Sequence, residues 1–591
     1  MMFMNIYESK LLNIISHGGF SNQRQLSDET GFSLGLINKS LQSLKDSGLI
    51  TSDYQLTKKA SILINKSHPK NAIILAAGYG LRMVPINMDC PKGLLTVDGE
   101  HLIDRLIKQL KEKQINDITV VVGFMKEKYE YLIDTFGVKL VYNKDYATKN
   151  NLHSLNCVVN QISNTYIIPC DIWCVKNPFS DTEFYSWYML NELIDSNSTV
   201  RVTRNQSIEN IKKDQSGNKM IGISYISEND SKQLKDNIKK LCKDIANDNV
   251  FWEKALFDMG NIEVNANIML SSEVTEINSY EQLRELDCSS KELENESLEV
   301  ISKTLNCKNE DIKNIKTLKK GMTNRSFIFT VDSKKYIMRI PGEGTDKLIN
   351  RKEEADVYNT IKGKNICDEL FYINPDNGFK ISSFVENSRV CDPYNFEDVS
   401  KCMKKLKHFH DMKLKVNHEF NIVKQIDFYE SLWLEPKSIF DDYQQTKKNV
   451  LSLIPFVNKN KAENVLTHID AVPDNFLFSK KGKTENIQLI DWEYAGMQDP
   501  HVDIAMFCIY SLYDSKEEID KVIDLYFENN CDQKTRIKIY CYVALCGFLW
   551  SNWCEYKRQL GVEFGEYSLK QYRYAKDYYK IASKEIKELG E

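Results

Sequence analysis

The chain has 591 residues, of which 42% are hydrophobic and 27% charged, and its formal net charge is −5. This length exceeds what one hydrophobic core supports, so we expect three or four domains. The negative charge excludes a protein that coats nucleic acid over its whole surface, and no run of 18 apolar residues predicts a membrane span. The first residues lack the features of a signal peptide and the 15 cysteines form no CxxC pair, so we expect a cytoplasmic protein with free thiols.

Residues 1–67 are predicted to form a small helical domain. Apolar residues recur at helical spacing in 8–18, 21–31 and 33–50, and residues 50–64 read as a short hairpin with Asp53 at its tip. Two helices and a turn followed by such a hairpin resemble the winged helix–turn–helix fold. Residues 1–70 carry eight Lys and Arg against five Asp and Glu, a weak signature of DNA binding through the helix near Ser33–Lys45. A docking or dimerisation module is the alternative for residues 1–66.

The second predicted domain, residues 70–290, alternates strands and helices. The buried strand AIILAAG is followed by the amphipathic helix LIDRLIKQLKEKQI and the strand DITVVVGF. This rhythm predicts a parallel sheet with crossover helices, a Rossmann-like α/β/α sandwich. Near residue 290 the sequence becomes polar and charged, which indicates a domain boundary.

A glycine-rich loop follows the first strand of this domain. LAAGYGLRM, residues 75–83, carries Gly78, Gly80 and Arg82, and Lys92 follows in PK. The glycines let backbone N–H groups approach a triphosphate, and the two basic side chains can neutralise it. A dinucleotide-binding fingerprint is excluded because Met83 stands where its third glycine would be.

This stretch resembles the nucleotidyltransferases that join an NTP to a phosphorylated small molecule, whose signature is L-A-A-G-x-G-x-R followed by P-K. The resemblance implies catalytic and nucleotide-binding roles for Arg82 and Lys92, with Gly78 and Gly80 holding the phosphates. It also implies Mg²⁺ on Asp171, at the end of the strand in IIPCDIW. The second metal ligand falls in TEINSYEQL, where Asn278 replaces the expected aspartate; an amide oxygen can still coordinate Mg²⁺.

The text YNKDYATKNNLHSL, residues 142–155, resembles the bacterial phosphocholine cytidylyltransferases in particular. A quaternary ammonium favours aromatic rings and a carboxylate. Trp173, Trp252 and Glu276 are therefore the candidates for binding it in this domain, and core packing is the alternative for each tryptophan.

The third predicted domain, residues 295–591, contains two motifs in order. VLTHIDAVPDNFLF, residues 465–478, carries H-x-D-x-x-P-x-N, and IQLIDWEYAG follows at 487–496. Together they resemble the choline kinase and aminoglycoside phosphotransferase branch of the bilobal, protein-kinase-like α+β fold. The resemblance implies that Asp470 orients or deprotonates the attacking hydroxyl, that Asn475 and Asp491 bind Mg²⁺, and that His468 buttresses the loop.

The first lobe of this domain fits the kinase pattern with one change. Arg339, in KKYIMRIPG, stands at the position of the kinase lysine, as the choline kinases of this branch commonly have it. Its carboxylate partner is expected at Glu354, with Glu353 as the alternative, and GMTNRSF, residues 321–327, is expected to cover the phosphates of ATP.

Aromatic residues are expected to bind the substrate cation in the third domain. Trp550 and Trp553, three residues apart, share one helix face, and choline kinases carry a comparable W-x-x-W. Trp492 and Tyr494, beside Asp491, are expected to complete the aromatic wall of the cation-binding site.

The two predicted sites describe consecutive reactions in a multidomain α/β protein. The third domain would phosphorylate choline with ATP, and the second would transfer CMP from CTP to phosphocholine, giving CDP-choline for surface glycans. The alternatives are a regulator that senses choline or CDP-choline, or the same two activities on ethanolamine or another amino alcohol. The sequence leaves the nucleotide base, the oligomeric state and transfer between the sites open.

Overall fold

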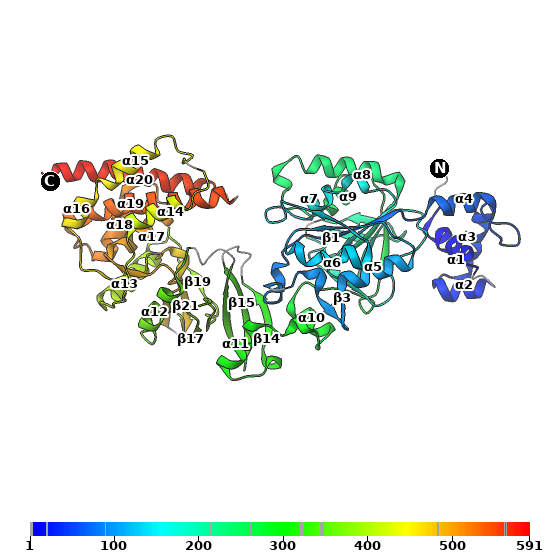
Figure 1. Ribbon diagram of the computed structural model, residues 1–591, viewed down its shortest axis with the longest axis horizontal. Coiled ribbons are helices and arrows are strands. Elements are labelled where there is room, and N and C mark those ends of the chain that lie inside the picture. The colour runs from blue at the N-terminus through cyan, green and yellow to red at the C-terminus, as the bar shows by residue number, and fades with distance from the viewer. Residues whose placement is uncertain are drawn as a thin grey trace. The chain divides into compact units, whose positions relative to one another are not determined.

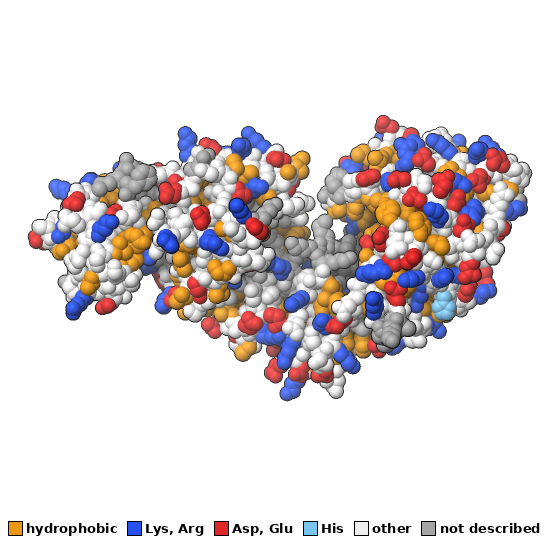
Figure 2. Space-filling view, turned by 180° about the vertical axis from the view of Figure 1, so that it is seen from behind, with side chains coloured by type: hydrophobic (Ala, Val, Ile, Leu, Met, Phe, Trp, Pro, Cys, Tyr) orange, Lys and Arg blue, Asp and Glu red, His pale blue; other side chains and the backbone are white. Residues whose placement is uncertain are grey.

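A computed structural model shows two compact units, residues 1–295 and 296–591. It describes residues 4–18, 22–88, 90–212, 214–260, 262–318, 324–342, 348–435, 437–481, 484–560, 562 and 564–590. No helix within these ranges is long and apolar enough to cross a membrane. On the face drawn in Figure 2, acidic and basic side chains are interspersed, as the small net charge leads one to expect.

The first unit begins with four helices: α1 (Ile6–Ser16), α2 (Gln23–Thr30), α3 (Leu34–Asp46) and α4 (Lys58–Lys66). Leu11, Leu26, Ile37 and Leu41 form its core together with other apolar side chains, which confirms the predicted helical module. The predicted hairpin is wrong in its second half. Only the bridge between Ile50 and Leu56 forms, because the Thr57 side chain caps a helix by accepting a hydrogen bond from the Ala60 N–H group.

A seven-stranded sheet is the centre of the first unit. Its order is β12 (Asn265–Met269), β8 (Trp187–Asp195), β11 (Gly217–Ile226), β6 (Thr165–Pro169), β1 (Asn71–Ala76), β4 (Ile118–Val122) and β5 (Lys139–Tyr142). Strands β6, β1, β4 and β5 are parallel, and β11 runs antiparallel to both of its neighbours. The predicted parallel sheet is thus confirmed, with one reversed strand inserted.

Helices cover both faces of this sheet (Figure 1). One face packs α5 (Leu102–Glu112) and α6 (Tyr131–Phe136), and the other packs α7 (Asn151–Asn156), α8 (Glu228–Leu241) and α9 (Glu253–Phe257). Alternate residues of β1 enter the two cores, with Ile74 on the first face and Ile73 on the second. The unit is therefore a three-layer sandwich, and the remaining helix α10 (Tyr280–Leu286) follows its last strands.

Short strand pairs complete the first unit. They are β2 (Thr96–Val97) with β3 (Glu100–His101), β9 (Val200–Val202) with β10 (Ile208–Asn210), and β7 (Ile172–Cys174) with β13 (Val274–Glu276). The last pair brings the segment after β6 beside β13, because Ile172 pairs with Glu276, which lies 104 positions further along the chain.

The second unit has two lobes, as predicted for a kinase-like fold. The first follows α11 (Glu296–Leu305) and is an antiparallel sheet of order β14 (Lys313–Thr317), β15 (Asn324–Val331), β16 (Lys334–Pro341), β18 (Lys380–Ser383) and β17 (Leu370–Ile373), with helix α12 (Arg351–Ile361).

The second lobe is mainly helical. Its helices are α13 (Phe396–Asp411), α14 (Ile422–Ser431), α15 (Tyr443–Leu451), α16 (Ile454–Lys459), α17 (His501–Tyr510), α18 (Lys516–Phe527), α19 (Gln533–Gln559) and α20 (Glu566–Glu588). Helix α19 is the central core helix of this lobe: most of its residues are buried, and it packs against α14, α17 and α20. The short strands are β19 (Arg389–Val390), β20 (Val465–Thr467), β21 (Phe476–Lys481), β22 (Thr484–Leu489) and β23 (Gly496–Gln498).

Candidate active sites

The glycine-rich loop of the first unit lies between β1 and the predicted basic side chains. Gly80 has a φ of +61°, and a Cβ atom there would come within 2.9 Å of Lys92 Cγ. Gly80 is therefore required both by its left-handed backbone and by the close passage of the lysine. Gly78 has no atom within 4 Å of where its Cβ would be, so the space beside it is open to a ligand.

Four of the predicted residues converge on one point next to this loop. Lys92 Nζ donates to Asp171 Oδ2 at 2.7 Å and to Asn278 Oδ1 at 2.8 Å. Arg82 Nη2 donates to the same Asn278 oxygen at 2.9 Å. Asp171 follows β6 and Asn278 follows β13, and the pairing of β7 with β13 brings them together. The carboxylate and amide oxygens thus already face a common cation, which is the arrangement a divalent metal would need.

Glu276 and Trp173 lie beside this cluster. Burial raises the pKa of Glu276, and the nearby Asp171 raises it further. The Trp173 side chain is buried, and the guanidinium of Arg105 covers its ring at 4.2 Å. Trp252 is also buried and packs against Tyr188. The structure therefore brings Glu276 to the site, whereas both tryptophans are packed against other side chains.

One further carboxylate near Glu276 has no sequence motif. Glu253 is partly buried at the start of α9, where it accepts from Tyr188 Oη at 3.0 Å, and burial raises its pKa to about 7. Its other oxygen has no hydrogen-bond partner among the described residues. Only the fold shows that it is near Glu276, since the two are 23 positions apart in sequence.

The predicted catalytic loop of the second unit is tightly restrained. Asn475 Nδ2 donates to Asp470 at its backbone oxygen (2.9 Å) and at Oδ2 (3.0 Å). Burial raises the pKa of Asp470 to about 7, with Asp491 as the next cause. Ile469 and Asp491 both have positive φ, +70° and +69°, which is strained for a β-branched residue such as Ile469.

Asp503 of α17 holds this loop in place. Its two carboxylate oxygens accept from the backbone N–H groups of His468 at 2.9 Å and Ile469 at 2.6 Å. His410 Nε2 lies 3.0 Å from the same carboxylate. The side chain of His468 is buried and reaches Ile490 O at 3.0 Å, next to Asp491. His468 is thus positioned to buttress the loop, and Asp503 is a supporting residue that the motif does not reveal.

Arg339 forms a buried ion pair with Glu354 rather than with Glu353. The two contacts, Nη1–Oε1 at 2.6 Å and Nη2–Oε2 at 2.7 Å, are bidentate. Arg351 Nη1 lies 3.1 Å from the same carboxylate, and Glu493 Oε2 lies 3.7 Å from both arginines. This network joins β16 and α12 to the segment that follows Asp491.

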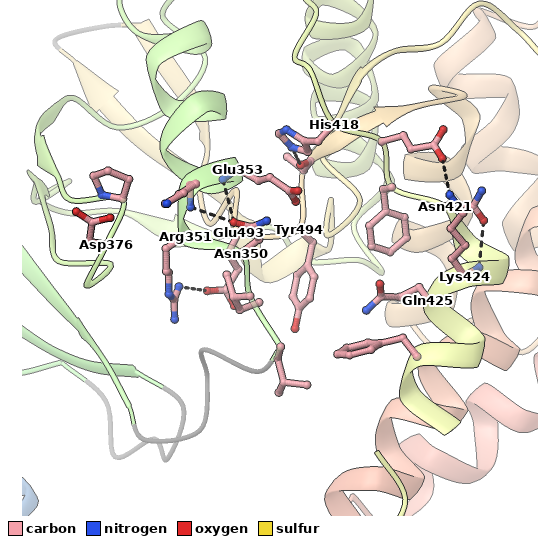
Figure 3. Close-up of a pocket in the computed structure, with 18 residues that line it drawn as sticks. Asn350, Arg351, Glu353, Asp376, His418, Asn421, Lys424, Gln425, Glu493 and Tyr494 are labelled. Carbon is pink, nitrogen blue, oxygen red and sulfur yellow. Dashed lines mark hydrogen bonds and ion pairs between the residues drawn. The ribbon is translucent and has the colours of Figure 1, made fainter. Parts of the chain in front are cut away.

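A cavity of 630 Å³ lies next to this network. Figure 3 shows Asn350, Arg351 and Asp376 on one side, Asn421, Lys424 and Gln425 on the other, and Glu493 and Tyr494 between them. Residues 321–323 of the predicted phosphate-covering loop lie outside the described residues, and its remaining residues, 324–327, belong to β15.

Aromatic rings form a continuous cluster near Asp470. Tyr494 contacts Trp550 at 5.6 Å between ring centroids, and Trp550 contacts Trp553 at 5.6 Å. The series continues through Phe564, Tyr567 and Tyr510. Tyr429 is 6.5 Å from Trp550. These residues come from α14, α17, α19, α20 and the loops beside them, so only the fold assembles Tyr429, Tyr510 and Tyr567 with the predicted pair.

Trp492 lies elsewhere, in the hydrophobic core. It is 0% exposed, its indole N–H donates to Leu489 O at 2.8 Å, and its ring contacts His468 at 4.4 Å and Phe409 at 5.0 Å. The positive φ of Asp491 turns the chain at this point. Trp492 therefore supports the catalytic loop through its contact with His468 and does not belong to the aromatic cluster.

The donor atoms of both sites suit Mg²⁺. Within the described ranges, no group of three or more His, Cys, Asp or Glu side chains could hold a metal alone. Each candidate site instead combines aspartate with asparagine, and Mg²⁺ commonly completes its coordination with water and substrate phosphates. Asp171 with Asn278, and Asn475 with Asp491, are the residues that would hold it.

Comparisons with known proteins agree with this architecture. Family profiles match for winged helix-turn-helix DNA-binding proteins over residues 4–51, MobA-like NTP transferase domains over 72–185, and choline/ethanolamine kinases over 315–545. The choline-phosphate cytidylyltransferase of Streptococcus pneumoniae is 44% identical over 117 residues, which are 20% of this chain and 51% of that enzyme. The chain thus matches about half the length of that relative.

The kinase-like unit matches its relatives over most of their length. Protein LicA of Haemophilus influenzae is 30% identical over 270 residues, which are 42% of this chain and 96% of LicA. The crystal structure of choline kinase LicA from Streptococcus pneumoniae shares 28% identity and covers 48% of this chain and 97% of its own, with a TM-score of 0.42. The chain belongs to the choline/ethanolamine kinase family, and it joins that kinase domain to an NTP transferase domain and a winged helix–turn–helix module.

Proposed function

We propose that the chain phosphorylates choline with ATP and then transfers CMP from CTP to the phosphocholine, giving CDP-choline and pyrophosphate. The observation that carries this proposal is that one chain brings together two sets of candidate phosphate-transfer residues: Asp171, Asn278 and Lys92 in the first unit, and Asp470 with Asn475 in the second. The relatives named for choline and for choline-phosphate support the same substrate for both units.

In the kinase reaction, the choline hydroxyl attacks the γ-phosphorus of ATP and ADP leaves. Asp470 accepts the hydroxyl proton, and its pKa of about 7 suits a general base at neutral pH. Asn475 holds the carboxylate by its hydrogen bond to Oδ2, and Asp503 holds the loop that presents it. Arg339, fixed by Glu354, supplies positive charge for the ATP phosphates.

In the transfer reaction, a phosphate oxygen of phosphocholine attacks the α-phosphorus of CTP and pyrophosphate leaves. Lys92 and Arg82 are the cations nearest the glycine-rich loop, so they stabilise the charge that develops on the leaving pyrophosphate. Bound Mg²⁺ would neutralise phosphate charge in both reactions. Asp171 and Asn278 are the residues that would hold this ion in the first unit, where Lys92 and Arg82 lie beside them to bind the phosphates.

The aromatic cluster around Trp550 and Trp553 favours choline over ethanolamine. A quaternary ammonium cannot donate a hydrogen bond and is held by aromatic faces, whereas a primary ammonium needs acceptors. We further propose that CDP-choline serves as the phosphocholine donor for surface glycans. The N-terminal module is proposed to contact DNA through α3, on which Asn38, Lys39 and Gln42 are exposed.

Two single variants separate the two reactions. Asp470→Asn should abolish phosphocholine formation and leave conversion of supplied phosphocholine to CDP-choline intact. Asp171→Asn should do the reverse, so that phosphocholine accumulates from choline and ATP. Loss of both activities in either variant, with the fold retained by circular dichroism, would contradict the assignment of one reaction to each unit.

A further inference from the structure

The N-terminal module is seated on one loop of the nucleotidyltransferase domain. We call Ser180, Asp181, Glu183 and Phe184 the seat. Phe184 packs against the apolar core of the module, and His17 Nε2 at the end of α1 lies 3.0 Å from Asp181 Oδ2. One edge of the module is thus held by the apolar contact of Phe184 and by the ion pair between His17 and Asp181.

Hydrogen bonds extend this contact to the segment after α4. The Glu183 N–H group donates to Ser67 O at 2.8 Å, and Asn13 Nδ2 donates to Ser180 Oγ at 3.3 Å. His68 Nδ1 contacts the backbone oxygen of Asp181. The module is thus attached through the end of α1 and the end of α4, and its attachment includes backbone, ionic and apolar contacts.

The inner side of the seat is bonded into the central sheet. Tyr166 Oη donates to Glu183 Oε1 at 2.6 Å and receives the Ser180 N–H group at 3.0 Å. Trp187 Nε1 donates to the other Glu183 oxygen at 2.9 Å. Tyr166 is fully buried on β6, and Trp187 is buried at the start of β8. The seat is therefore clamped between the module and two strands of the sheet.

One of these strands, β6, ends two residues before the candidate metal ligand Asp171. Asp171 lies between β6, which carries Tyr166, and β7, whose end continues into the seat. Arg105 fixes the far end of β7 by donating to Cys174 O and Val175 O, both at 2.8 Å. The segment that runs from Asp171 to the seat is thus held at its start by the sheet and at its end by the module.

We propose that the N-terminal module acts as a positioning element of the nucleotidyltransferase site: by clamping the seat, it keeps β7 and Asp171 in the geometry that binds CTP with Mg²⁺. This inference rests on the proposed transfer reaction and adds a function for the module beyond nucleic-acid contact. Its attachment edge differs from the exposed face of α3, so both functions are compatible on one module.

The test uses the full-length chain with Phe184→Ala and, separately, His17→Ala. The control is Asp28→Ala, which changes an exposed residue of α2 away from the seat. Hydrogen exchange of the peptide that contains Glu183 reports whether the seat has opened, because that amide donates to Ser67 O. The functional readouts are the Kd of CTP with Mg²⁺ and the Mg²⁺ concentration for half-maximal transfer to supplied phosphocholine.

We expect faster exchange at the seat in the two seat variants, together with a rise of roughly 2- to 30-fold in both readouts, the range of coupling between distant packed sites. Choline phosphorylation by the same samples and every readout of Asp28→Ala should stay at the wild-type level. An opened seat with unchanged CTP affinity and unchanged Mg²⁺ dependence would overturn the proposal. If the wild type binds CTP but transfers nothing to phosphocholine, the proposed function fails, and the Kd of CTP still decides this inference.

Discussion

Glu354→Gln keeps the shape of a buried side chain and removes its charge. The native carboxylate, 0% exposed, faces Arg339 and Arg351 at distances between 2.6 and 3.1 Å. Burial by itself would raise the pKa of Glu354, but Arg339 and the neighbouring Lys380 and Arg351 lower it from 4.5 to about 2. That difference of roughly 2.5 pKa units corresponds to about 3 kcal/mol of stability.

The sign of this contribution follows from the lowered pKa. The stabilisation is complete above the pKa of the unfolded chain, near 4.5, and is lost as the pH falls toward 2. At pH 7 the variant also removes the carboxylate that the two buried arginines share, and breaking a buried pair commonly costs about 3–5 kcal/mol. The two estimates of the lost stability agree. We also expect loss of choline phosphorylation, because Arg339 loses the carboxylate that fixes its position.

The assay compares thermal unfolding and both activities in Glu354→Gln, with Glu353→Gln as the matched control. For a unit of this size, about 3 kcal/mol lowers the midpoint of the kinase transition by roughly 6–12 °C. The control, whose carboxylate does not pair with Arg339, should change the free energy of unfolding by less than about 0.5 kcal/mol. CMP transfer to supplied phosphocholine should persist in both. An unfolding midpoint and kinase rate within error of the wild type in Glu354→Gln would refute this account of the ion pair.

Three further predictions concern the two sites. Because burial and then Asp491 raise the pKa of Asp470 to about 7, kcat/KM for choline phosphorylation should fall tenfold per pH unit below that value, and a midpoint below pH 5 in a pH–rate profile would contradict its role as base. Trp553→Leu should raise the KM for choline by roughly 2- to 30-fold, the range of one cation–π contact, and change that for ethanolamine less; equal effects on both substrates would argue against the cage. Asn278→Asp should lower the Mg²⁺ concentration for half-maximal CMP transfer, since a carboxylate binds Mg²⁺ more strongly than an amide, whereas Asn278→Ala should raise it; unchanged Mg²⁺ dependence in both would remove Asn278 from the metal site.

Motifs that are contiguous in sequence predicted most of the architecture. The loop after the first strand, H-x-D-x-x-P-x-N and the second aspartate each lie on one strand–loop segment, so local chemistry identifies them. Helical phase decided between Glu353 and Glu354, because only one of two consecutive residues in α12 can face β16. The prediction of a strand in the second half of the hairpin was wrong. Thr57 is a good helix cap, and this local preference outweighed the expected strand.

Residues brought together only by tertiary folding could not be predicted. Tyr429, Tyr510 and Tyr567 come from three different helices, and none has a neighbouring motif. Trp492 is expected in the substrate site because it neighbours Asp491, but its side chain is buried in the core and donates to Leu489 O, next to the left-handed backbone of Asp491. Asp503 was missed for a related reason: it acts through backbone N–H groups of the catalytic loop, which leave no signature in the sequence.

The most direct test of the central claim is product analysis by mass spectrometry with isotopically labelled choline, Mg²⁺, ATP and CTP, leaving out one component at a time. The two-site account predicts labelled CDP-choline only when both nucleotides are present, labelled phosphocholine alone when CTP is left out, and neither product without ATP. Formation of neither product in the complete mixture, by a protein that still binds choline, would contradict it and favour a choline-sensing protein.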